Sequence, residues 1–89
     1  MHAVVATVRV DHPEEVRKLL ETARVEVVKR APGLVSAYWL EPVNSIGMSV
    51  LVFETRDNAE AATSYPLPPI PGVTPLSLEI REVYARVGP

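Results

Sequence analysis

The sequence predicts an α+β fold in which four strands and two helices follow the order β-α-β-β-α-β. Three observations support this order. Stretches rich in β-branched residues alternate in polarity, an amphipathic stretch of helical period follows the first of them, and turn residues separate the two middle stretches. With right-handed crossovers, both helices lie on one face of a four-stranded antiparallel sheet.

The first strand is predicted over residues 3–10 and the first helix over residues 13–30. Asp11 and Glu14 form a D-x-x-E variant of the capping box, and Pro13 suits the first helical turn. The sequence "APG" at 31–33 ends the helix. Apolar residues recur at spacings of three and four and predict one buried stripe: Val16, Leu19, Leu20, Ala23 and Val27.

The remaining elements are a hairpin, a short helix and a last strand. Strands are predicted over 34–43 and 48–55 around the turn "NSIG", and Asp57 with Glu60 opens the second helix. A fourth strand over 76–87 changes its apolar parity, which predicts a bulge near Arg81–Glu82. The chain, residues 1–89, is therefore predicted to be a single ferredoxin-like domain.

The stretch "PLPPIPGVTP", residues 66–75, holds five prolines, which exclude a helix or a central strand. We expect a stiff connection that covers part of the sheet face left bare by the short second helix. The alternative is a PxxP ligand for an aromatic groove, but no basic residue flanks the stretch and it lies between two structural elements.

Both faces of the predicted sheet are apolar. In the third strand, Met48, Val50 and Val52 point one way, whereas Leu51 and Phe53 point the other. Helices on one face would leave an apolar patch on the other, larger than monomers usually expose. We therefore expect a second copy to cover it, giving a homodimer joined through the sheet face.

The chain resembles the dimeric α+β barrel superfamily, which includes the antibiotic-biosynthesis monooxygenase-like and stress-responsive barrel proteins. The resemblance is carried by "VVATVRV", by the amphipathic helix that ends in "APGLVSAYWLEPV", and by "MSVLVFETRDNAEAA". It covers nearly the whole chain. It implies a homodimer whose sheets close into a dimeric α+β barrel, with a small-molecule cavity between sheet and helices in each subunit.

Composition excludes several classes of function. The chain has no cysteine, and its net charge of −2 provides no basic surface for nucleic acid or anionic membrane. No apolar run approaches the roughly 20 residues of a membrane span, and the first residues lack a signal-peptide pattern, which favours the cytoplasm. A CxxC motif, a glycine-rich phosphate loop and an aromatic RNA-binding signature are all missing, so no metal or cofactor is predicted.

Candidate site residues come mainly from the resemblance. Heme-degrading members of the superfamily use a histidine on the second helix, and no histidine follows His12 here. Cofactor-free oxygenation of aromatic polyketides, another activity of the family, relies on Asn, Trp and Tyr side chains. Trp39, Asn44, Tyr65 and Tyr84 are therefore the candidate ligand-binding residues, although packing for Trp39 and a turn role for Asn44 are competing interpretations.

Two functions remain open on this basis. The first is a homodimer that binds an apolar or aromatic small molecule and resembles cofactor-independent monooxygenases. The second is a non-catalytic ligand-sensing or assembly domain. A third class, an amino-acid-binding allosteric domain of ACT type, is disfavoured because "DHPEE" stands where that class has a glycine-rich turn.

Overall fold

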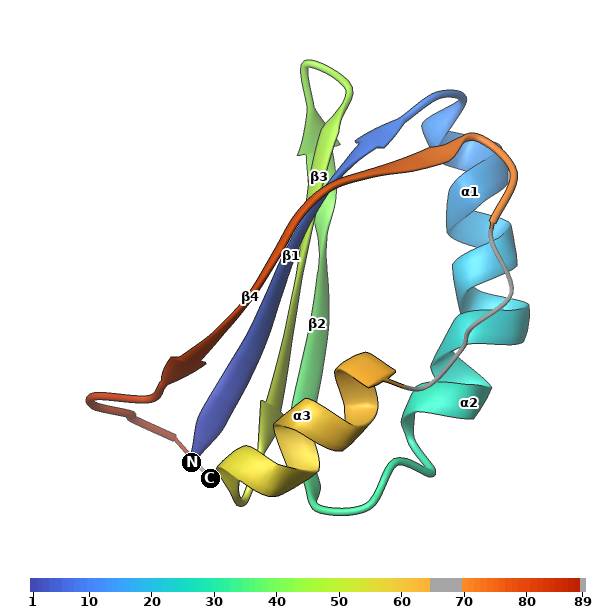
Figure 1. Cartoon of the computed structure of the whole chain (residues 1–89). Helices are drawn as coiled ribbons and strands as arrows, with labels where there is room; N and C mark the ends of the chain where they lie inside the picture. Colours follow the sequence, from blue (N-terminus) through green and yellow to red (C-terminus); the bar gives the residue numbers. More distant parts are fainter. Residues whose placement is uncertain (65–69, 89) are drawn as a thin grey trace.

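A computed structural model describes residues 1–64 and 70–88 of the chain (Figure 1). Within these residues, one antiparallel sheet has the strand order β2-β3-β1-β4. Its strands are β1 (His2–Val10), β2 (Leu34–Val43), β3 (Ile46–Phe53) and β4 (Val73–Glu82). The helical segments are α1 (Pro13–Leu19), the π-helical turn η1 (Leu20–Arg24), α2 (Val25–Val28) and α3 (Arg56–Ser64). The predicted α+β, ferredoxin-like order is confirmed.

Strand pairing assigns the side chains to two faces of the sheet. Val4 lies opposite Leu51 and Ile80 on the inner face, which both helical layers cover (Figure 1). The predicted parity of the third strand agrees with this register. In β2, a register shift between Leu34 and Ser36 brings Leu34 to the inner face together with Ala37 and Trp39, whereas simple alternation would place Leu34 on the other side from them.

The main buried cluster lies in one half of the inner face, beneath α3. Phe53 is fully buried at the end of β3 and packs with Val4 and with Ala59 of α3. Partly buried residues complete this cluster: Ala31, Leu34, Leu51, Ala62 and Ile80. The helix formed by α1, η1 and α2 makes few close contacts with the sheet, so the other half of the face is not packed in this way.

The first helix differs from the prediction in its middle. At Val25 the backbone N–H donates to the carbonyl of Leu20, five residues earlier, which defines a π turn. The hydroxyl of Thr22 donates to the carbonyl of Lys18 (2.9 Å), a side-chain bond of the kind that bends helices. The predicted continuous α-helix over 13–30 is therefore wrong between residues 20 and 24.

Both predicted helix caps are also wrong. Asp11 still belongs to the extended connection, because its N–H donates to a carbonyl of the segment before β4 (2.7 Å). His12 takes the N-cap position with φ of 54° and no side-chain capping bond. At α3 the cap is Thr55 rather than Asp57, since the Asn58 N–H donates to the Thr55 hydroxyl oxygen (3.1 Å).

The last strand both begins and ends earlier in the sequence than predicted. It starts at Val73, includes Pro75 and ends at Glu82, and its register shift lies opposite Val8 rather than near Arg81–Glu82. The proline is tolerated because β4 is an edge strand, where one N–H need not pair. Of the predicted connection over residues 66–75, residues 66–69 lie outside the described residues, and residues 73–75 belong to β4.

No helix within the described ranges is both long and apolar enough to cross a membrane.

Candidate ligand-binding cavity

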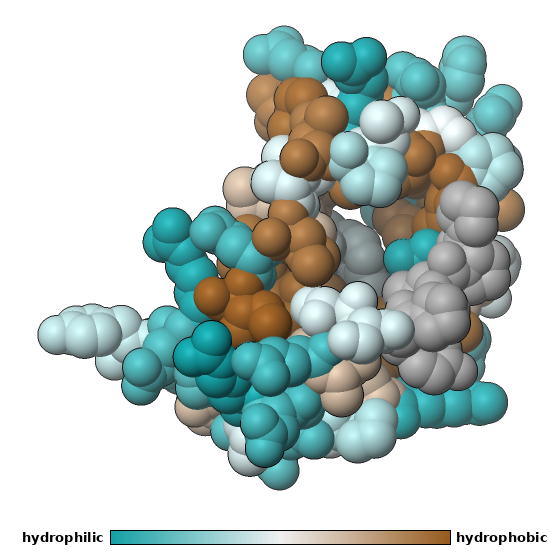
Figure 2. Space-filling view, viewed as in Figure 1, coloured by the Kyte–Doolittle hydropathy of each residue, from teal (hydrophilic) through white to brown (hydrophobic). Residues whose placement is uncertain are grey.

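A cavity of about 1050 Å³ lies between the inner face of the sheet and the α1–η1 helix. Figure 2 shows the hollow with hydrophobic residues around its rim. The cavity forms because α3 fills the other half of the sheet while the longer helix stands away from this half. Its size lies at the upper end of the roughly 300–1,000 Å³ typical of small-molecule sites.

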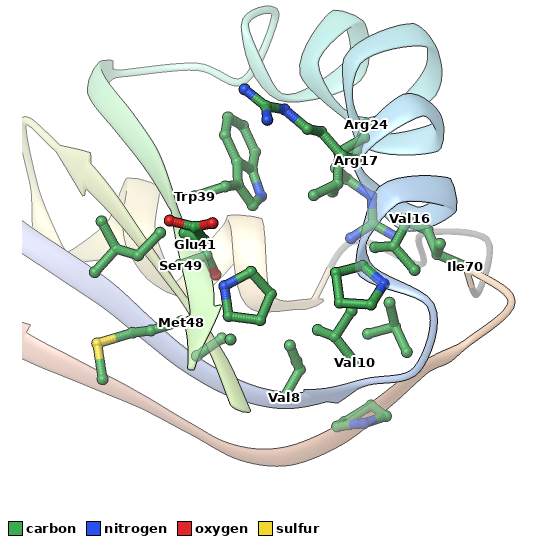
Figure 3. Close-up of a pocket in the computed structure, with 18 of the residues that line it drawn as sticks. Val8, Val10, Val16, Arg17, Arg24, Trp39, Glu41, Met48, Ser49 and Ile70 are labelled. Atoms are coloured by element: carbon green, nitrogen blue, oxygen red, sulfur yellow. The ribbon is translucent and has the colours of Figure 1, made fainter. Parts of the chain in front are cut away.

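The sheet supplies a mostly apolar wall. Ala6, Ser49 and Trp39 lie side by side across β1, β3 and β2, and Leu78 of β4 is the other neighbour of Ala6. All four line the cavity. Trp39 is half-buried, and its indole ring projects from β2 into the space (Figure 3). This wall offers an aromatic face and aliphatic surface to a ligand.

The helix supplies a charged wall. Its lining includes four side chains of alternating sign: Glu14, Arg17, Glu21 and Arg24. Arg17 and Glu21 form a solvent-exposed ion pair (3.5 Å). Arg24 is only half-exposed, and burial lowers the pKa of its guanidinium from the usual value. The cavity is therefore apolar on the sheet side and carries a partly desolvated cation on the helix side.

The π turn places Arg24 on this wall. Inward positions of the helix recur every fourth residue: Val16, Leu20, Arg24 and Val28. In an α-helix of 3.6 residues per turn, the side-chain direction rotates around the helix axis by about 40° with each four-residue step. The wider π turn reduces this rotation. As a result, three residues of the predicted buried stripe are exposed instead: Leu19, Ala23 and Val27.

The four predicted site residues do not come together among the described residues. Trp39 lines the cavity. Asn44 is exposed in the β2–β3 turn with φ of 52°, and Tyr84 is fully exposed beyond the end of β4. Tyr65 lies outside the described residues. The prediction missed Arg24, because the three- and four-residue spacing of an uninterrupted α-helix places Ala23 rather than Arg24 on the inner side.

No protein-family model and no curated protein matches the chain. Its fold is similar to solved structures of MhuD, a heme-degrading protein of Mycobacterium tuberculosis. MhuD with two hemes bound in its active site is 22% identical, with a TM-score of 0.72 over 99% of this chain and 100% of that chain.

Two further MhuD structures agree. A substituted form with two manganese protoporphyrin IX molecules per active site is 22% identical, with a TM-score of 0.71 over 100% of both chains. The heme-free form with cleaved protein is 25% identical, with a TM-score of 0.60 over 97% of this chain and 99% of that chain. The resemblance is confirmed in its fold. This chain has the ferredoxin-like fold of these MhuD structures.

Proposed function

We propose that this chain is a small-molecule-binding barrel protein that holds a flat, largely apolar aromatic molecule in the cavity. The observation that carries the proposal is the hollow of about 1050 Å³ where a packed core would otherwise lie. Trp39 presents a ring face there, and aromatic rings stack in offset or edge-to-face arrangements.

The likeness to MhuD supports a large planar ligand. Two of the similar structures hold heme or manganese protoporphyrin IX in their active sites. A tetrapyrrole is therefore one candidate for the ring system. The cytoplasm remains the expected location.

The described lining does not fit ligation of a heme iron. Protein ligands to heme iron are histidine, cysteine, methionine or tyrosine side chains. Within residues 1–64 and 70–88, no histidine or tyrosine lines the cavity. Met48 lies at its edge, but its cross-strand neighbours Thr7 and Leu40 place it on the outer face of the sheet. We therefore propose a ligand held by its rings rather than through a metal.

Cofactor-independent oxygenation of an aromatic substrate is the reaction class we propose to test first. The alternative is non-catalytic ligand sensing. One observation favours this alternative: Asn44 and Tyr84 lie away from the cavity, so the described residues do not assemble the Asn, Trp and Tyr set that the family resemblance implies.

We further propose that two copies pair through the outer face of the sheet. The single chain exposes 6541 Å², whereas a monomer of 9.8 kDa is expected to expose about 5,200 Å². The excess is larger than the roughly 800 Å² that each partner buries in a standard interface. Exposed apolar residues on this face include Tyr38 at 57%, Leu40 at 51% and Val43 at 69%.

The single tryptophan allows a direct test of ligand binding. Titration of anthrone into the protein should change the Trp39 fluorescence and raise the melting temperature, because a ligand at 100 times its Kd adds about 2.7 kcal/mol of stability. Trp39→Ala should weaken binding at least tenfold, as measured by calorimetry. Tyr84→Ala is the matched control, since that ring is fully exposed and its loss should change nothing.

Oxygen consumption with the same anthrone separates the two functions. Uptake that depends on Trp39 supports the oxygenase, and binding without uptake supports the ligand sensor. Absence of binding by anthrone, quinols and metal-free protoporphyrin alike would refute both.

A further inference from the structure

We propose that residues 83–88, which we call the arm, pack against the second copy of this chain. This inference rests on the pairing of two copies through the outer face of the sheet, proposed above, and adds a second contact to that interface. It follows from the direction of the arm, from the exposure of its side chains and from a slot that it shares with the outer face.

The arm has a fixed starting point and then leaves the sheet. The Val83 N–H donates to the carbonyl oxygen of Met1 (2.9 Å), which extends the pairing of β1 with β4 by one residue. Further along, the Arg86 guanidinium contacts the Met1 sulfur (3.4 Å). Figure 1 shows the arm projecting from the end of β4 on the side of the sheet away from the helices. The arm therefore lies on the side where we expect the second copy.

Two side chains of the arm are uncovered in the single chain. Tyr84 and Val87 are each 103% exposed, so neither is packed against the described part of its own chain. An apolar side chain in this position gains stability only when another molecule removes it from water. Tyrosine is also among the residue types that contribute most to protein–protein binding, because its large ring buries roughly 150–250 Å².

The arm also borders the outer face. A slot of about 300 Å³ lies between them, lined by Tyr38 and Val52 on the sheet and by Val83 and Val87 on the arm. Tyr38 pairs with Val50 at the centre of the outer face, so the slot is continuous with the proposed interface. Its volume is at the lower end of the range for small-molecule sites, which suits side chains of the partner better than a large aromatic ligand.

The exposed area leaves room for this second contact. The single chain exposes 6541 Å², about 1,300 Å² more than a monomer of 9.8 kDa is expected to expose. A standard interface accounts for about 800 Å² per partner. Packing of the arm on the partner uses part of the remainder.

The dissociation constant of the dimer tests the arm. In analytical ultracentrifugation, Tyr84→Ala should raise this constant at least about a hundredfold, because loss of an important interface tyrosine exceeds tenfold and the two-fold axis removes the contact twice. Val87→Asp should raise it too, since its carboxylate would lose water against the partner. Val27→Asp is the matched control, because Val27 is exposed on the helix and its substitution should leave the constant unchanged. The affinity of Tyr84→Ala for anthrone should not change, since the cavity lies within one chain.

Proteolysis provides a second measurement on an unaltered arm. Chymotrypsin cleaves after an accessible Tyr84, and mass spectrometry identifies the loss of residues 85–89. Cleavage should be at least tenfold slower in the unaltered dimer than in Val50→Asp, whose charge on the outer face should separate the copies.

The outcomes separate the two proposals. A dimer whose dissociation constant is the same in Tyr84→Ala would overturn the role of the arm and leave the pairing through the sheet intact. Equal rates of cleavage after Tyr84 in the dimer and in a monomeric Val50→Asp would overturn it as well. If the unaltered protein is monomeric at micromolar concentration, the proposed pairing itself fails and the arm contact fails with it.

Discussion

Replacing Val50 by aspartate should separate the proposed dimer into single chains. Val50 is half-buried at the centre of the outer face, directly opposite Val5 and Tyr38 on the neighbouring strands. In a sheet-to-sheet dimer these apolar neighbours would be enclosed by the partner. A carboxylate placed there would lose its water without gaining a counter-charge.

The size of the effect follows from the symmetry of the assembly. An uncompensated buried charge costs about 3–5 kcal/mol, and a two-fold axis places one in each chain, so the dimer loses about 6–10 kcal/mol. Since each 1.4 kcal/mol is tenfold in affinity, the dissociation constant should rise by at least about 10⁴. For a single chain the same substitution affects only a half-exposed strand position, at a cost of about 1 kcal/mol.

Light scattering after size exclusion measures this directly. The unaltered protein should have about twice the chain mass of 9.8 kDa, and Val50→Asp should have the mass of one chain while remaining folded by circular dichroism. Ala23→Asp adds the same charge on the exposed side of the helix and should stay dimeric. An unaltered protein that runs as a single chain at micromolar concentration, or a Val50→Asp variant that keeps the dimer mass, would refute the reasoning.

Three further predictions concern stability in urea unfolding. Phe53→Ala should lower the free energy of unfolding by about 3–5 kcal/mol, because this ring is fully buried. Phe53→Leu should lower it by less than about 1.5 kcal/mol. Equal losses in the two variants would contradict the packing of Phe53. Gly33→Ala should cost more than about 1 kcal/mol, since φ is +76° and the new methyl group meets the side chain of Asn58. The double variant Gly33→Ala/Asn58→Ala should regain the stability lost through the clash with the Asn58 side chain. If it regains none, the clash between these two positions is contradicted. Thr55→Ala should lower the free energy of unfolding by about 1 kcal/mol, because it removes the cap of α3. Thr55→Ser keeps the hydroxyl and should retain most of this stability; equal losses in the two variants would contradict the capping role.

Sequence patterns predicted the sheet better than the helices. Alternation of side chains fixes the face of a strand directly, so the predicted division of the third strand, with Val50 on one side and Phe53 on the other, is correct. Proline was misleading in one place. Pro75 suggested a connection, but on an edge strand it interrupts no obligatory pairing.

The helix shows why the site was only partly predictable. Spacings of three and four assume an uninterrupted α-helix, and on that assumption Ala23 belongs inside and Arg24 outside. A π turn leaves no compositional mark, so this part of the lining could not be placed from periodicity alone. Trp39 was predicted because its residue type matched the family resemblance, and its strand then carried it into the cavity.

The π turn has a consequence for how binding and helix geometry are linked. At unchanged chain length, regular α geometry through residues 20–24 would rotate the following residues by about 100° and present Ala23 and Val27 to the sheet in place of Arg24. The pitch of this one turn therefore decides whether the helix presents an aliphatic or a cationic surface to the sheet.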